Sequence, residues 1–134
     1  MSLLWKTAVD ASEGPYYHGT VEEFHPGDVI SPAEDRTGYT NYPGQSDSRY
    51  SYATEDHDSA WDYAEKSWHA ADGDSGHPRV YRVSPLGRHS KDPEYDKRGK
   101  HRGNWSYDRR SKHGWKVEEE LPMPEHMGTP EDWR

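Results

Sequence analysis

Three separated segments of this chain carry side chains that could act together on a sugar. His18 and Gly19 end a short aromatic stretch, Tyr52 lies in a second one, and Asp92 directly precedes a proline. An imidazole can hydrogen-bond a ribose hydroxyl, a phenol ring can face a planar group, and a carboxylate can stabilise developing positive charge. Such groups work mainly by positioning and electrostatics, so the set suits a reaction in which a cationic group leaves a sugar.

The first segment, residues 16–20, reads Tyr-Tyr-His-Gly-Thr and predicts a short strand that ends in a turn. Because glycine has no Cβ, the backbone at Gly19 can approach a neighbouring group closely. We expect Thr20 to brace the turn. Taken alone, the motif fits an ordinary strand end with a satisfied histidine, so its meaning depends on the other two segments.

The second segment, residues 49–54, alternates as a strand does and leads into a helical pattern over residues 58–71. In this order the two segments resemble the core of the ADP-ribosyltransferase and poly-ADP-ribose polymerase superfamily, and most of all the bacterial rifamycin ADP-ribosyltransferases. That family has a Tyr at a strand end, then a Ser or Thr, then an Ala inside the next helix. Tyr52, Thr54 and Ala60 follow this order, whereas Ala53 stands where the family usually has Phe.

The third segment supplies the acid. In the rifamycin enzymes an Asp-Pro follows a Pro-x-Gly turn that closes a strand, and Pro85, Gly87 and Asp92 keep that order. A basic pair and a Gly-Asn come next in the family, and residues 97–98 and 103–104 are similar. By itself Asp-Pro is a common start of a turn. The resemblance implies that His18, Tyr52 and Asp92 are the catalytic residues.

The resemblance also implies a binding site for NAD. The residues that would hold it are Tyr17, His18, Gly19, Thr20, Tyr52, Thr54 and Ala60. Two alternatives stay open. Tyr50 points to the same side of its strand as Tyr52 and is the register alternative. Glu118 and Glu120, expected on one face of a late strand, fit the Glu-x-Glu of protein-modifying toxins, although such a run is more often a solvated edge strand.

The activity that the resemblance implies is transfer of ADP-ribose from NAD, as co-substrate, to a hydroxyl of a small molecule such as a rifamycin-type antibiotic, with release of nicotinamide. The acceptor is the least constrained part, because residues 21–46 contain no long apolar run. Alternatives are a transferase that modifies a protein or a nucleic acid, and a non-catalytic module that binds NAD or ADP-ribose.

The distribution of charges and histidines limits which nucleic-acid partners and metal ions the chain is expected to bind. The formal net charge of −8 argues against a duplex nucleic-acid partner. Residues 88–116 are an exception with ten Lys and Arg, which could attract the pyrophosphate of NAD or form a solvated loop. The nine histidines show no His-x-x-x-His, and His57 sits between two aspartates where a helix cap is expected, so we expect no catalytic metal.

Composition and pattern predict an α+β fold. Only 29% of residues are hydrophobic, with ten Tyr and six Trp against one Phe, so aromatic rings should fill the core and their polar atoms should find partners. Strands are expected at residues 15–20, 28–32, 49–54, 79–84 and 115–121, with a basic loop over 86–110. Together with the resemblance, this predicts a single small domain, mostly antiparallel, with two small sheets around an NAD cleft and one or two helices.

The ends of the chain look different from its middle. We expect a flexible segment over residues 1–13, the ADP-ribosyltransferase-like domain over 14–122 and a polar, disordered tail over 123–134. There is no cysteine and no apolar run near the ~20 residues that cross a bilayer. We therefore expect a cytoplasmic monomer without a membrane partner.

Overall fold

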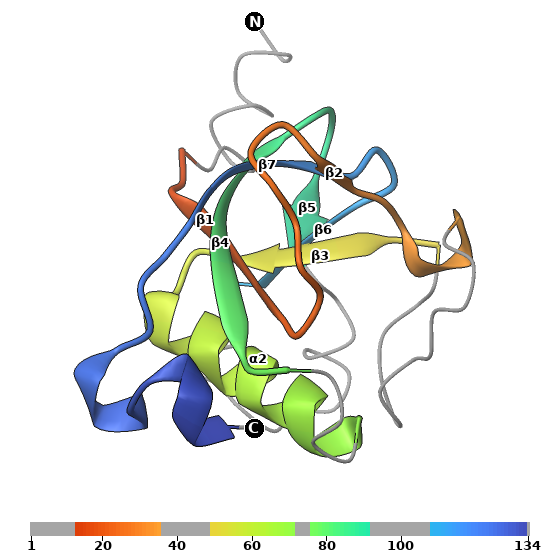
Figure 1. The fold of residues 1–134 in the computed structure, drawn as a ribbon. Helices are drawn as coiled ribbons and strands as arrows, with labels where there is room; N and C mark the ends of the chain where they lie inside the picture. The colour runs from red at the N-terminus through yellow and green to blue at the C-terminus, as the bar shows by residue number, and fades with distance from the viewer. Residues whose placement is uncertain (1–12, 36–48, 72–75, 92–107, 134) are drawn as a thin grey trace, which may run out of the picture.

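The computed structural model describes residues 13–35, 49–71, 76–91 and 108–133 (Figure 1). Its strands form one antiparallel sheet in the order β2-β7-β4-β1-β3-β6-β5. Their bounds are β1 Tyr16–Thr20, β2 Val29–Ile30, β3 Ser51–Thr54, β4 Arg79–Pro85, β5 Ser90–Lys91, β6 Asp108–Ser111 and β7 Trp115–Glu120. The helices of this described part are α2 His57–Ala70 and three 3-10 turns, η1 Ala33–Asp35, η3 Glu125–Met127 and η4 Pro130–Trp133. The expected α+β class is confirmed.

The sheet is narrowest where β1 meets β3. These strands share one registered pair, Tyr17 with Thr54, whereas β1 and β4 share five. β3 runs across the direction of β4 at this point (Figure 1). We expected two small sheets, and the described strands belong to one sheet with this narrow junction in its middle. The NAD cleft stays a prediction.

Aromatic rings are the largest side chains of the core, in which they pack with valines, alanines and Ile30. Trp115 and Tyr81 are the largest fully buried side chains, and both have partners for their polar atoms. The indole N–H of Trp115 donates to the carbonyl of Ser51 at 3.0 Å. The Tyr81 hydroxyl donates to the carbonyl of Glu22 at 2.9 Å and accepts the N–H of Phe24 at 2.8 Å. Burial raises the pKa of the Tyr81 phenol, and its two bonds tie the loop after β1 to β4.

The helix α2 begins where an aspartate caps it. A carboxylate oxygen of Asp56 accepts the N–H of Ser59 at 3.0 Å, so Asp56, rather than Asp58, is the cap. Ala60, Trp61 and Ala64 form the buried stripe. Because alanines lie on this stripe, the helix axis can come close to the sheet.

Gly19 is where α2 and the sheet come closest. A Cβ built on Gly19 would lie 1.9 Å from the carbonyl oxygen of Ala60 and 2.9 Å from the backbone nitrogen of Ala64. Since real side-chain atoms never approach backbone this closely, only glycine fits at this position. Gly19 therefore sets the distance between β1 and α2.

Two expectations about polar segments were wrong. The predicted loop over residues 86–110 contains β5 and the start of β6, where Asp108 and Arg109 are buried despite their charge. The predicted tail also packs on the protein: Met123 and Met127 contact the α2 cluster, and the Trp133 ring lies 5.0 Å from that of Trp68. Figure 1 shows this C-terminal segment beside α2. Of the predicted flexible segment, residues 1–12 lie outside the described residues.

The close approach of β1 and α2 gives a stability prediction. Gly19→Ala should lower the free energy of unfolding by on the order of 3 kcal/mol, because the new methyl group meets helix backbone that cannot rotate away. Gly27→Ala is the control: Gly27 has φ +96° and nothing within 4 Å of the added Cβ, so only a backbone cost of about 1 kcal/mol is expected. Denaturant unfolding of both variants is the measurement, and equal losses would contradict the packing role of Gly19.

Candidate active site

His18 is held against the neighbouring strand by its side chain. Its Nδ1 lies 2.7 Å from the backbone carbonyl oxygen of Tyr52 on β3. A carbonyl can only accept, so Nδ1 carries the proton and donates it to this oxygen. His18 shares its face of β1 with Tyr16 and Thr20 and is half-buried. The bond places a proton on Nδ1 and fixes the orientation of the imidazole.

Tyr52 and Tyr50 lie side by side on one face of the chain at β3. Their ring centroids are 6.5 Å apart, and both residues are half-buried. The guanidinium of Arg110 lies over the Tyr50 ring at 3.9 Å from its centroid. One face of Tyr50 is therefore already covered by a cation. Tyr52 is the tyrosine whose own backbone holds the His18 ring.

The structure thus brings two of the three predicted catalytic residues together at the β1/β3 junction. The contact between His18 and the Tyr52 carbonyl stands next to the single registered pair of these strands. Asp92 lies outside the described residues, in the chain directly after Lys91 of β5. Its place relative to His18 stays a prediction.

Other residues predicted to bind NAD lie in the framework around this junction. Tyr17 packs on the α2 side of β1, with its ring 5.5 Å from that of His57. Ala60 is fully buried and Thr54 is 1% exposed. The Thr54 hydroxyl accepts the N–H of Asp56 at 3.1 Å. These side chains hold the end of β3 and the start of α2 in place, so their support for a ligand would be indirect.

Gly19 and Thr20 also have structural partners. Gly19 faces α2, so the neighbouring group that its backbone approaches closely is the helix backbone. The Thr20 hydroxyl accepts the N–H of Glu22 at 3.0 Å, which is the turn-bracing contact expected of it.

We expected Glu118 and Glu120 to lie on one face of β7, and in the structure they do not. A bulge opposite Arg82 and Val83 shifts the register of β7, so Val83 pairs with Val117 but Arg82 pairs with Glu119. Glu118 accepts the hydroxyl of Ser84, whereas Glu120 pairs with Arg79 at 3.2 Å. Ser84 and Arg79 lie on opposite faces of β4, because side chains alternate along a strand. The bulge therefore separates Glu118 from Glu120.

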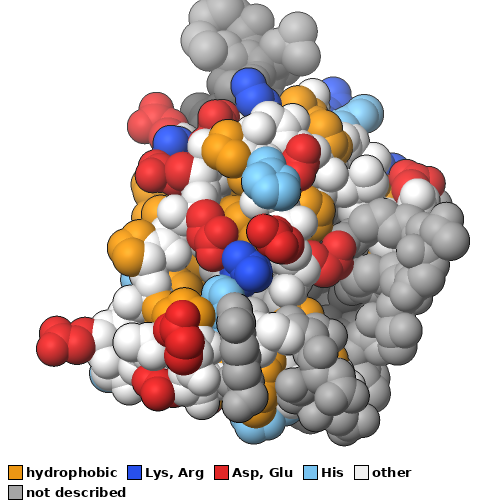
Figure 2. Space-filling view, in the orientation of Figure 1, with side chains coloured by type: hydrophobic (Ala, Val, Ile, Leu, Met, Phe, Trp, Pro, Cys, Tyr) orange, Lys and Arg blue, Asp and Glu red, His pale blue; other side chains and the backbone are white. Residues whose placement is uncertain are grey.

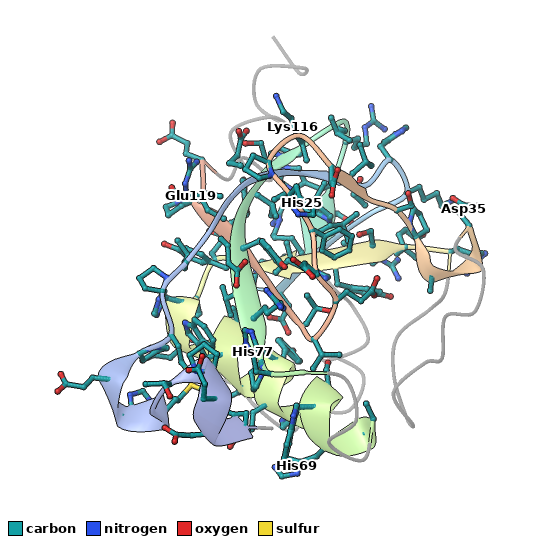
Figure 3. All side chains as sticks on the ribbon, viewed as in Figure 1. His25, Asp35, His69, His77, Lys116 and Glu119 are labelled. Atoms are coloured by element: carbon teal, nitrogen blue, oxygen red, sulfur yellow. The ribbon has the colours of Figure 1, made fainter. Side chains whose placement is uncertain are left out.

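The acids of β7 instead take part in contacts across the β4–β7 pair. Arg82 donates to Glu119 at 2.7 Å, and Arg79 pairs with Glu120 at 3.2 Å. Glu119 points outward from the sheet (Figure 3). On the face drawn in Figure 2, acidic and basic side chains adjoin one another rather than forming one large patch of a single sign. The Ser84 hydrogen bond lowers the pKa of Glu118, which favours its ionised form.

Metal-binding geometry is absent from the part of the chain that the structure describes. There, no group of three or more His, Cys, Asp or Glu side chains could hold an ion. His25, His69 and His77 come from three different segments and lie apart in Figure 3. The described helices include none long and apolar enough to cross a membrane.

The junction between β1 and β3 lies within a region that matches a known protein family. A family model described as Rifampin ADP-ribosyl transferase matches residues 16–123. The chain belongs to the rifampin ADP-ribosyl transferase family. The match begins with the first residue of β1 and ends beyond β7, so it contains His18, Tyr52 and all the described strands. The resemblance inferred from the motifs is confirmed, and the activity of this family is ADP-ribosyl transfer. No individual curated protein matches the chain.

The contact between Ser84 and Glu118 predicts a pH effect on stability. Ser84→Ala should raise the pKa of Glu118 toward its usual range, because the hydroxyl that stabilises the carboxylate is lost. A carboxyl whose pKa is lower in the folded state than in the unfolded state stabilises the fold at pH values above its unfolded-state pKa. This stabilisation is lost as the pH falls through the folded-state pKa. The stability gap between wild type and Ser84→Ala should therefore be larger at neutral pH than below about pH 4.

Carboxyl titration by NMR, together with unfolding at both pH values, is the measurement for this variant. Ser90→Ala, on the exposed edge strand β5, is the control and should leave the Glu118 pKa unchanged. An unchanged Glu118 pKa in Ser84→Ala would show that the hydroxyl does not control this acid.

Proposed function

We propose that this protein transfers ADP-ribose from NAD to a hydroxyl of a small-molecule acceptor, with release of nicotinamide. The acceptor suggested by the family is a rifamycin-type antibiotic, in which case the reaction would confer resistance to it. The observation that carries the proposal is the hydrogen bond from His18 to the Tyr52 carbonyl inside the region matched by the family. It joins two segments, 34 residues apart in the chain, that sequence order alone had linked to one site.

The chemistry asks little of the protein in the way of a nucleophile. The bond between nicotinamide and the ribose C1′ breaks, and its electron pair leaves with the ring as neutral nicotinamide. The ribose is left with oxocarbenium character, and the acceptor oxygen forms the new bond to C1′ while its proton is released. Positioning of the sugar and stabilisation of its positive charge supply most of the catalysis.

Each of the three residues has a role that its chemistry allows. We assign His18, whose ring is oriented by its Nδ1 hydrogen bond to the Tyr52 carbonyl, to a hydrogen bond with a ribose hydroxyl. Tyr52 is the ring that faces nicotinamide, in preference to Tyr50, which has Arg110 over it. The Asp92 carboxylate stabilises the sugar cation. Glu120, paired with Arg79, serves the sheet instead.

The choice between the two acids can be tested directly. Asp92→Asn should lower the rate of nicotinamide release by at least about 100-fold, because a negative charge is lost where positive charge develops. Glu120→Gln should change this rate less than about fivefold, since it breaks only an ion pair at the surface. Release of nicotinamide from NAD is the measured quantity. The reverse order of effects would place the catalytic acid on β7.

The acceptor class is tested with NAD labelled in its adenosine moiety. We expect label on rifampicin in a reaction that depends on both protein and acceptor, because the family match covers all the described strands. Incubation with a cell extract, followed by separation of protein, nucleic acid and small molecules, locates the label. Label confined to macromolecules would move the proposal to another acceptor. Binding of NAD without any nicotinamide release would leave a non-catalytic module.

A further inference from the structure

Cationic side chains surround Tyr50 on the face of the sheet that carries Tyr52. The Arg110 guanidinium lies 3.9 Å from the Tyr50 ring centroid, the Lys112 ammonium 5.5 Å and the Arg49 guanidinium 5.9 Å. These distances are within the range of cation–π contacts. We call Arg49, Tyr50, Arg110 and Lys112 the Tyr50 cluster. It gathers three positive charges around one ring in a chain whose formal net charge is −8.

The charges of Arg110 and Lys112 are not neutralised by described carboxylates. Neither Arg110 nor Lys112 forms an ion pair with a described acid, whereas the described arginine pairs use Arg79 and Arg82 on β4. Among the described residues the Nε of Arg110 is buried and has no hydrogen-bond partner. Asp108, on the same face of β6, accepts the hydroxyl of Tyr63 at 2.6 Å. Like charges held this close repel one another, so an anion would stabilise the arrangement.

The position of the cluster relates it to the candidate active site. Arg110 is the registered partner of Tyr52 across the β3–β6 pair, and residues directly opposite each other in a sheet share a face. Tyr50 stands one pleat from Tyr52, with ring centroids 6.5 Å apart. The Tyr52 backbone in turn holds His18. The cations therefore lie immediately beside the ring to which we assign the nicotinamide end of NAD.

Pyrophosphate chemistry fits such a neighbour. In NAD the two phosphates follow directly after the nicotinamide ribose. A protein that binds this ribose therefore also holds the negative charge of the phosphates nearby. The planar guanidinium of Arg matches phosphate oxygens with two parallel hydrogen bonds, and a Lys ammonium adds a mobile point charge. Stacking on Tyr50 orients the Arg110 fork before a ligand arrives, which reduces the entropy lost on binding.

We propose that the Tyr50 cluster, with Arg110 and Lys112 as its principal cations, binds the pyrophosphate of NAD. This inference rests on the proposed function and extends it, because it gives the phosphates a site on β6 and its end rather than on the basic segment before β6. It also gives Tyr50 a role of its own, as the platform for Arg110 beside the ring of Tyr52.

The test compares binding of NAD, ADP-ribose and nicotinamide by calorimetry. Arg110→Gln should weaken NAD and ADP-ribose about tenfold and Lys112→Gln about fivefold, because each removes a charged partner of phosphate. Nicotinamide lacks phosphates, so its binding should be unchanged. The matched control is Lys116→Gln, an exposed lysine on β7 that removes the same charge outside the cluster. Higher salt should weaken NAD binding more in wild type than in the two cluster variants.

Arg110 is half-buried, so thermal unfolding of Arg110→Gln must accompany its binding data. Lys112 is exposed, and its variant tests the cluster even if Arg110→Gln does not fold. Equal NAD affinity in wild type and Lys112→Gln, or a loss shared by Lys116→Gln, would overturn the assignment. A raised KM for the acceptor with unchanged NAD affinity would also overturn it, because the cluster would then serve the acceptor. Failure of wild type to bind NAD at all would instead refute the proposed function itself.

Discussion

The contact between the backbones of β1 and α2 is the constraint on which the site depends. With no side chain at Gly19, the helix lies so near the strand that a single added carbon would overlap the carbonyl of Ala60. This closeness determines where β1 runs and so where His18 is presented. The capped start of α2 follows directly from β3 through Thr54 and Asp56. One tight helix–strand contact thus positions both strands that meet at the candidate active site.

The polar atoms of two large buried rings, those of Trp115 and Tyr81, hydrogen-bond to the backbone of neighbouring elements and so help to hold the fold together. The core has few Leu or Ile to contribute, and Trp115 and Tyr81 occupy its centre. The indole of Trp115 reaches across from β7 to the backbone of β3, while the Tyr81 hydroxyl bonds twice to the loop after β1. Directional bonds of this kind specify which strand lies against which, because apolar contact alone has no direction.

Elements with an apolar period could be predicted from the sequence, and those built from charged residues could not. The helix and strands β1, β3, β4 and β7 follow recognisable alternation. β6 escaped prediction because residues such as Asp108 and Arg109 are normally exposed, and their burial depends on partners elsewhere, such as Tyr63 and His89. The bulge in β7 is likewise invisible in a run of three glutamates, since it arises from pairing with β4. For the site, motif order linked His18 to Tyr52, but only coordinates could reveal that the contact uses a backbone oxygen.

A side-chain hydrogen bond reinforces the junction between β1 and β3. These strands share one registered residue pair. The imidazole of His18 adds a second link between them, in which a side-chain N–H instead of a backbone amide donates to the opposite strand. In the proposed function the same imidazole also binds the substrate ribose, so occupancy of the site would be linked to the rigidity of the sheet around it. Kinetic losses in any His18 variant will therefore combine two effects, and amide exchange at the ends of β1 and β3 is the observable that separates them.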